Sequence, residues 1–347
     1  MDKHNYEILS GDTVVAVWNN GALTVCNEAL LPLFLKRLSN ADLWLKSRAI
    51  DSHRANSRLL KKALRLTEKD DISTVVHVNA ATITDNYWIR DIGSALTYGD
   101  IDFSDDYFSS LALKGTYNSF NRAASSGRSK TPELTNTGSF EKCWKLRNGK
   151  WWLYKRASHD EMFSELFICE LGRALGMNMA LYERGNGYIK SLDFTNGASV
   201  NFEPASSFMG DDDDYVSVVE ALRRICPSAI PDYIRLIFMD TVTANPDRHT
   251  NNFGLLRDTK TGELLGLAPN YDNNMALIAR GYPSLPKKSD LLIKLFNELT
   301  DAYPEYRRYI PSLNETLVSD VISRLGMKVR GKYITELVLA RYGLIKR

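Results

Sequence analysis

Three polar residues follow an apolar stretch late in the chain and carry the side chains that phosphoryl-transfer chemistry uses. Asp247 and Asn252 stand five residues apart in a polar loop, so a carboxylate and an amide oxygen can meet in one small space. Asp272 follows twenty residues after Asn252, behind a strand-like stretch at 263–268. Such oxygens are the ligands that Mg²⁺ prefers. The order Asp, Asn, Asp is typical of phosphoryl transfer from ATP, in which one Asp orients the attacking hydroxyl and the other two residues hold the metal.

Each of these residue types, taken singly, is more often a turn former than a catalyst. The conjunction favours function, because turn chemistry alone does not explain why an Asp-Arg-His string, two asparagines and a later Tyr-Asp follow one apolar helix. The interpretation as a chemical site therefore depends on the whole set.

A hairpin and a helix precede this region and are expected to position further polar groups. Residues 139–146 and 150–156 form strand-like stretches on either side of Asn148-Gly149, and Asn-Gly favours the type I′ turn of a tight hairpin. Lys155 lies on the second strand among aromatic residues, where burial of its ammonium group requires a compensating charge. The stretch 159–175 has apolar residues at helical spacing and predicts a helix.

The rest of the chain predicts a small β-rich lobe followed by a larger helical lobe. Short strands are expected at 180–182, 187–190 and 199–202, and helices at 216–225, 233–243, 290–299, 313–325 and from 329 onward. The fold class is therefore expected to be α+β.

Five motifs occur in a fixed order along the carboxyl-terminal part of the chain. They are the segment TNTGSFEK at 135–142, Lys155, the helix ending LGRALGM, the string NPDRHTNNFG with the preceding Asp240, and the later APNYD. In this order they resemble the motifs of the HipA-like serine/threonine kinases, over about residues 132–347. The resemblance implies a protein-kinase-like two-lobed fold and the use of ATP and Mg²⁺.

The resemblance also implies a role for each matched residue. Asp247 is expected to act as the base that orients the incoming hydroxyl, Lys155 to pair with the ATP phosphates, and Asn252 and Asp272 to coordinate Mg²⁺. The other expected ATP-binding residues form a phosphate loop, the helix that carries the partner of Lys155, and a hinge: Thr135, Asn136, Thr137, Gly138, Ser139, Glu165, Asn201, Phe202 and Glu203.

Some of these assignments have neighbours that compete with them. Glu161 lies one turn before Glu165 on the same face of the helix and is the alternative partner for Lys155. His249 invites a general-base role, but the resemblance makes both Arg248 and His249 architectural.

The phosphate loop also suggests regulation. Autophosphorylation is expected at Thr135, Thr137 or Ser139, because a phosphoryl group there would add about two negative charges and repel ATP.

Changes of pattern divide the chain into three predicted segments. Residues 1–130 form a mixed α/β amino-terminal domain, with strands such as 13–18 and 73–78 and helices around 30–38 and 54–66. Residues 131–205 form the kinase N-lobe and residues 206–347 the helical C-lobe, and the small polar stretch 125–137 is the expected connection. The amino-terminal domain does not match the subdomain known in the family, so its role stays open, including that of binding a regulatory protein.

Composition limits the classes of partner. The 347 residues include 44 basic and 42 acidic ones, a net charge of +2, so neither a membrane nor nucleic acid is favoured as the main partner. The basic helix at 54–66 leaves nucleic acid open. No apolar run is long enough for a membrane helix or an export signal, and the four scattered cysteines predict reduced thiols, so a cytoplasmic protein is expected.

Two other functions compete with a protein kinase that phosphorylates an unidentified protein. A DRH-x-x-N string followed by an Asp also resembles phosphoinositide kinases, which leaves a lipid or small-molecule kinase open. The second alternative is a catalytically silent nucleotide-binding or interaction protein. The complete set of Lys155, Asp247, Asn252 and Asp272 argues against that alternative, because a silent protein has no chemical need of all four.

Overall fold

The computed structural model describes residues 5–68 and 70–346. The first residues of the amino terminus, on which the expectation of no export signal partly depends, lie outside the described residues. The chain forms two compact units. The first unit comprises Met1–Arg156, Lys190–Glu203 and Leu256–Glu263, and the second comprises Ala157–Ile189, Pro204–Leu255 and Leu264–Arg347. The sequence predicts a division into three consecutive segments, which differs from these two units and stays a prediction.

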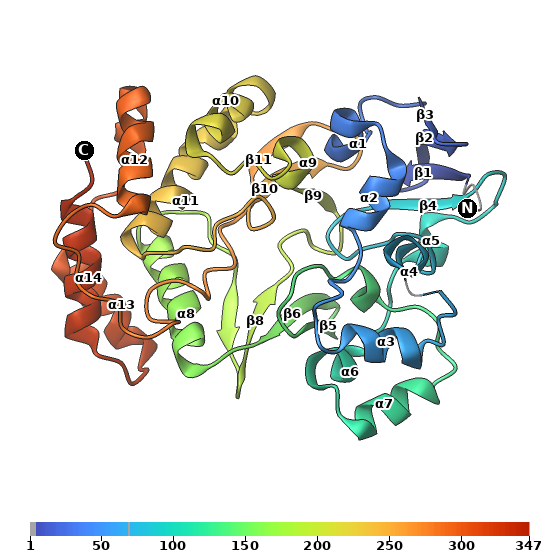
Figure 1. Ribbon diagram of the computed structural model, residues 1–347, viewed down its shortest axis with the longest axis horizontal. Helices are drawn as coiled ribbons and strands as arrows, with labels where there is room; N and C mark the ends of the chain where they lie inside the picture. Colours follow the sequence, from blue (N-terminus) through green and yellow to red (C-terminus); the bar gives the residue numbers. More distant parts are fainter. Residues whose placement is uncertain (1–4, 69, 347) are drawn as a thin grey trace. The chain divides into compact units, whose positions relative to one another are not determined.

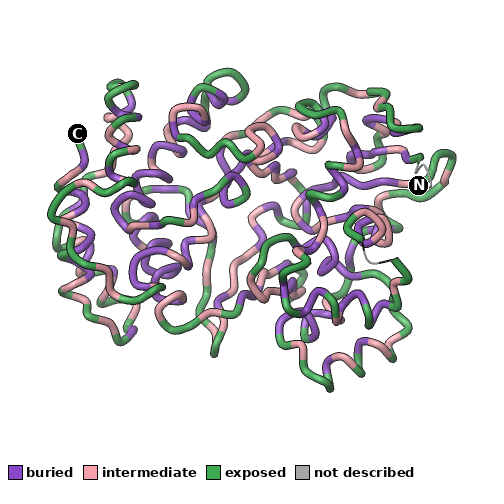
Figure 2. The backbone as a smooth tube through the Cα atoms, viewed as in Figure 1, coloured by how far each residue is buried: buried purple, intermediate pink, exposed green. Residues whose placement is uncertain are grey.

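The first unit contains an antiparallel sheet with the strand order β3-β2-β1-β4. Its core combines apolar side chains of the sheet, such as Ile8 and Trp18, with Trp44 and Val75 from helices that also contact each other (Figures 1 and 2). The elements are β1 (Tyr6–Ser10), β2 (Thr13–Asn19), β3 (Ala22–Val25), β4 (Tyr87–Asp91), α1 (Leu33–Leu38), α2 (Ala41–Ser47) and α4 (Asp71–Val76).

Two predictions for this unit need correction. The expected strand at 73–78 is wrong: residues 73–76 belong to α4, because the Asp70 side chain accepts a hydrogen bond from the Ser73 N–H and caps a helix there. The basic helix expected at 54–66 is shorter, α3 (Ser57–Ala63), and Lys61 on its expected polar face is buried. The charged side of this helix is therefore only partly exposed to solvent.

Small helices complete the first unit. They follow one another between β4 and the hairpin and include one 3₁₀ turn: α5 (Tyr98–Ile101), α6 (Ser109–Lys114), α7 (Tyr117–Ala124) and η1 (Pro132–Thr135).

The predicted hairpin is confirmed. Strands β5 (Lys142–Arg147) and β6 (Lys150–Arg156) pair antiparallel, and Asn148 and Gly149 have φ angles of 52° and 73°, as a type I′ turn requires. In the two other sheets, some strands include the residue at which the chain leaves one unit and enters the other. Their orders are β5-β6-β8-β7 and β11-β10-β9, with β7 (Tyr182–Arg184), β8 (Tyr188–Leu192), β9 (Val200–Pro204), β10 (Gly254–Asp258) and β11 (Leu264–Leu267).

The second unit is built around long helices. The expected helix at 159–175 is α8 (His159–Ala174), which begins with a capping box between Ser158 and Glu161. Helix α11 (Ile230–Val242) is buried along most of its length and contacts α12 and α14, while α13 contacts α8 and α14 (Figures 1 and 2). The other helices are α9 (Ser206–Met209), α10 (Tyr215–Ile225), η2 (Pro227–Ala229), α12 (Leu291–Ala302), η3 (Pro304–Tyr309), α13 (Glu315–Leu325) and α14 (Gly331–Gly343).

Among the described residues, none of the helices has the length and apolar character needed to cross a membrane. All four cysteines are free thiols, and Cys143, Cys169 and Cys226 are buried while Cys26 is exposed.

Candidate active site

A buried ion pair organises the loop that follows α11 in the second unit. Asp240 lies in the last turns of that buried helix, and its carboxylate accepts hydrogen bonds from Arg248 Nε at 2.7 Å and Nη2 at 3.0 Å. The two side chains are 0% and 3% exposed. Asn245 Nδ2 donates to the same carboxylate at 2.7 Å. Burial lowers the pKa of Arg248, but the attraction of Asp240 outweighs it, so the net pKa is raised and the guanidinium stays charged.

Arg248 also joins two loops that are separate in the sequence. Its Nη1 donates to the backbone oxygens of Asn252 at 2.5 Å and Tyr271 at 3.0 Å, and its Nη2 donates to Asn273 Oδ1 at 2.8 Å. The Tyr271 hydroxyl adds a hydrogen bond to the Asn251 oxygen at 2.8 Å. The loop that carries Asn252 and the loop that carries Asp272 are therefore held together by one side chain.

Asp247 is placed by its backbone. Its N–H donates to Asn245 Oδ1 at 3.1 Å, and its carbonyl accepts from Asn252 Nδ2 at 2.8 Å. In the part of the chain that the structure describes, no hydrogen bond or ion pair engages the half-buried Asp247 carboxylate. Its backbone is thus fixed, while its carboxylate oxygens can accept a hydrogen bond from a hydroxyl group.

The loop of Asp272 is held from the other side by α8 and β7. Asp272 has a φ of +61°, in the left-handed region, and its N–H donates to the Tyr182 hydroxyl at 3.1 Å. The next residue, Asn273, donates its N–H to Glu165 Oε1 at 2.9 Å and its Nδ2 to the same oxygen at 3.2 Å. Glu165, the expected partner of Lys155, thus contacts the Asp272 loop, whereas Glu161 caps α8.

Asn252 and Asp272 carry oxygen atoms of the kind that a magnesium ion binds. Asn252 uses its Nδ2 in the hydrogen bond to Asp247, which leaves Oδ1 as the atom that can bind a cation. Together with the Asp272 carboxylate, this gives a set of hard oxygen donors. Within residues 5–68 and 70–346, no group of three or more His, Cys, Asp or Glu side chains could hold a metal alone. Phosphate oxygens and water would have to complete the coordination shell.

The expected phosphate loop lies in the first unit and divides into a buried and an exposed half. The Thr135 hydroxyl is buried and donates to the Ala81 oxygen at 2.6 Å, and Asn136 Nδ2 donates to Glu133 at 3.0 Å. Thr137, Gly138 and Ser139 are exposed, and Gly138 has a φ of +92° that side-chain-bearing residues rarely adopt. The exposed half is the part that a ligand or a phosphoryl donor can reach.

Glu133 is a buried carboxylic acid next to this loop whose pKa is raised. Its carboxylate is fully enclosed and accepts the Trp144 N–H at 2.7 Å. Burial raises the pKa of Glu133 to about 7, although the hydrogen bonds from Asn136 and Trp144 and the charge of Arg54 oppose the shift.

Lys155 lies on β6 in the first unit, and its side chain is largely buried. Its Nζ is 4.4 Å from the centroid of the Phe140 ring, a cation–π distance. The ammonium group of Lys155 therefore lies beside one aromatic ring, that of Phe140.

The expected hinge residues form hydrogen bonds and an ion pair within the first unit. Asn201 Oδ1 accepts the Asn86 N–H at 2.8 Å, and the Phe202 N–H donates to the Thr84 oxygen at 2.9 Å. Glu203 forms a buried ion pair with Arg257 at 2.7 Å and accepts the Tyr87 hydroxyl at 2.9 Å. Contact of this segment with adenine stays a prediction.

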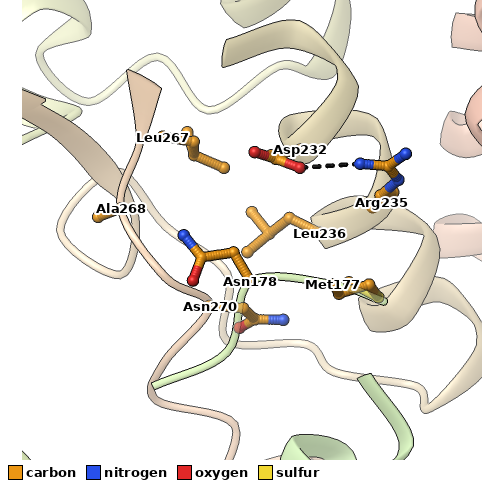
Figure 3. A pocket seen from close by; sticks show the side chains of 8 residues that line it. All are labelled: Met177, Asn178, Asp232, Arg235, Leu236, Leu267, Ala268 and Asn270. Carbon is orange, nitrogen blue, oxygen red and sulfur yellow. Dashed lines mark hydrogen bonds and ion pairs between the residues drawn. The ribbon is translucent and has the colours of Figure 1, made fainter. Parts of the chain in front are cut away.

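A small cavity in the second unit is too small for a nucleotide. It measures about 10 Å³, room for about one water, and lies between α11, the end of β11 and the segment after α8 (Figure 3). The buried Asn270 lines it, and Asn270 Nδ2 has no hydrogen-bond partner in the described part of the chain. Asn270 Oδ1 accepts from Arg248 Nη2 at 3.2 Å, so the cavity borders the polar network but is not the active site.

Sequence reasoning missed several residues that support the candidate site. Tyr182 and Glu133 sit in stretches that resemble no motif, and Arg54 lies more than eighty positions before the loop that it contacts. Asn245, which belongs to the NPDRHTNNFG string, and Asn273, which directly follows the APNYD string, had a local signal.

Comparison with known proteins identifies the fold. No protein-family model matches the sequence, and no curated protein matches it. Among solved structures, a chain of the Shewanella oneidensis MR-1 toxin–antitoxin complex of HipA, HipB and operator DNA is similar over 97% of both chains, with a TM-score of 0.55 and 12% identity. The Helicobacter pylori proinflammatory kinase CtkA is similar over 59% of this chain and 90% of its own, with a TM-score of 0.48 and 16% identity.

The chain therefore has a HipA-like kinase fold along nearly its whole length. The fold class predicted from the sequence, α+β and protein-kinase-like with a mixed α/β segment before it, is confirmed.

Proposed function

We propose that this protein is an ATP- and Mg²⁺-dependent phosphotransferase of the HipA-like class that phosphorylates serine or threonine in a protein. The observation that carries the proposal is the double role of Arg248: paired with Asp240, it holds the Asn252 loop and the Tyr271 loop together. Burying a guanidinium costs free energy. Its presence between the two loops therefore favours a role in fixing their relative position. The HipA-like fold supports the same reading.

In this proposal Asp247 orients the hydroxyl of the substrate and accepts its proton as the phosphoryl group leaves ATP. Its backbone is fixed by Asn245 and Asn252, so the carboxylate pays little reorganisation when the substrate binds. When bound, Mg²⁺ would neutralise charge that develops on the ATP phosphates. Asn252 and Asp272 would hold it, and Lys155 would pair with the phosphates.

Autophosphorylation of the phosphate loop belongs to the same proposal. Thr137 and Ser139 are exposed, whereas the Thr135 hydroxyl is buried and already donates to Ala81. We therefore favour Thr137 and Ser139 as acceptors.

Transfer of labelled γ-phosphate from ATP tests the proposal. Wild-type protein is incubated with Mg²⁺ and a protein mixture, beside Asp247→Ala and Asp272→Ala. Asp232→Ala is the matched control, because the half-buried carboxylate of Asp232 on α11 forms a partly exposed ion pair with Arg235 one turn away. The proposal expects transfer by wild type and the control, none with a chelator, and a large loss in both site variants. Undiminished transfer in both site variants, or none in wild type, contradicts it.

A further inference from the structure

Arg54 of the amino-terminal segment donates hydrogen bonds to the backbone of the expected phosphate loop. Both belong to the first unit. Arg54 Nη2 donates to the carbonyl oxygens of Asn136 at 2.5 Å, Gly138 at 2.8 Å and Thr137 at 3.2 Å, and Nε donates to Gly138 at 3.2 Å. One side chain thus engages three successive peptide groups.

These contacts fix the direction of the three peptide planes. No peptide bond among the described residues is cis, and in a planar trans peptide the N–H points opposite to the C=O. With the carbonyls of residues 136–138 turned to Arg54, the N–H groups of Thr137, Gly138 and Ser139 turn away from it. All three residues are exposed, and within the described chain no hydrogen bond takes up these N–H groups. Successive backbone N–H groups that face one side form a concave site for an anion.

The burial of Arg54 is hard to explain by stability alone. Arg54 is 1% exposed, and its Nη1 is buried and has no hydrogen-bond partner in the part of the chain that the structure describes. Burial lowers the pKa of the guanidinium, and the carboxylates of Glu133, Glu141 and Asp51 oppose this shift. An apolar side chain would avoid the cost of a buried charge with an unsatisfied donor.

Asn56, two residues after Arg54, contacts Glu141, which follows Phe140 and the exposed part of the loop. Asn56 Nδ2 donates to Glu141 and to the Ala112 oxygen at 3.0 Å. Gly115 makes room for this side chain, because a Cβ there would lie 1.9 Å from Asn56 Oδ1. Arg54 and Asn56 therefore contact the chain on both sides of the exposed residues 137–139.

We propose that Arg54 is a positioning residue that sets the N–H groups of residues 137–139 as a binding site for the phosphates of ATP, which gives the amino-terminal segment a part in nucleotide binding. The inference depends on the proposed function, since it specifies how the phosphate loop acquires its shape.

Binding of MgATP and of adenosine, measured by calorimetry on the full chain, tests the inference. Arg54→Gln removes the charge and the fork of donors, and Arg54→Lys keeps the charge but cannot reach three carbonyls at once. We expect Arg54→Gln to bind ATP about tenfold or more weakly, because charge-assisted hydrogen bonds to the phosphates are lost. Adenosine has no phosphate, so its affinity is expected to be unchanged. The ATP affinity of Arg54→Lys is expected to lie between those of wild type and Arg54→Gln. Arg54→Lys replaces Arg54→Gln in the test if Arg54→Gln does not fold.

Arg90→Gln is the matched control. Arg90 belongs to the same unit and pairs with Glu7 at 2.7 Å, and its hydrogen bonds in the described chain do not involve the loop. We expect it to change thermal stability without changing the ratio of ATP to adenosine affinity. Equal loss of both ligands in the Arg54 variants, or unchanged ATP binding, overturns the inference. A wild-type protein that binds adenosine but not ATP also overturns it, whereas one that binds neither contradicts the proposed function itself.

Discussion

Replacing Arg248 with methionine should destabilise the second unit strongly. The substitution leaves the carboxylate of Asp240, which is 0% exposed, without its counter-charge. Breaking a buried ion pair from one side costs about 3 to 5 kcal/mol. Arg248 also satisfies the carbonyl oxygens of Asn252 and Tyr271, so we expect a loss of about 4 kcal/mol or more in the free energy of unfolding.

The choice of probe matters, because all six tryptophans precede Arg156 and lie in the first unit. Tryptophan fluorescence therefore follows the first unit, and far-ultraviolet circular dichroism includes the long helices of the second. In urea unfolding, Arg248→Met should move the circular dichroism transition to lower denaturant. The control is Arg235→Gln, since Arg235 and Asp232 are 33% and 38% exposed and such a pair contributes about 1 kcal/mol or less.

A double-mutant cycle adds a second check. Arg248→Met combined with Asp240→Leu removes both charges, so the double variant should lose less than the sum of the single losses by roughly 1 to 3 kcal/mol. The reasoning is refuted if Arg248→Met costs no more than Arg235→Gln, or if the two single losses simply add.

Two further predictions concern the first unit. Folding raises the pKa of Glu133 from 4.5 to about 7, so stability from this group is full below about pH 4.5 and is lost as the pH rises through 7. Glu133→Gln should therefore be more stable than wild type by about 3 kcal/mol above roughly pH 8, with no such gain near pH 4, and a pH-independent difference in thermal unfolding would contradict this. In the loop, mass spectrometry after incubation with MgATP should find phosphate on Thr137 or Ser139, whereas modification of the buried Thr135 alone would count against the burial argument.

The sequence predicted those parts of the fold whose geometry depends on residues that are close together in the chain. Asn148-Gly149 determines its own hairpin turn, and the stretch that became α8 carries both its apolar spacing and its capping residues. The stretch 73–78 failed because β-branched residues suggested a strand, while the Asp70 cap and burial against α2 favour a helix.

The candidate site divides in the same way. Asp247, Asn252 and Asp272 could be proposed from the sequence because each lies in a short string with a recognisable order. The contacts of Tyr182 with Asp272 and of Arg54 with residues 136–138 join positions more than eighty residues apart, and a single sequence contains no local sign of them.

Turnover of the γ-phosphate of ATP by Asp247→Asn, beside its affinity for MgATP, tests the central claim most directly. The substitution keeps the size of the side chain and the backbone contacts with Asn245 and Asn252, and removes the charge that accepts the proton. A proton-accepting group of this kind contributes about 10²- to 10⁴-fold to the rate. We predict a fall of that size with unchanged affinity for MgATP. Equal turnover by wild type and Asp247→Asn would contradict the account.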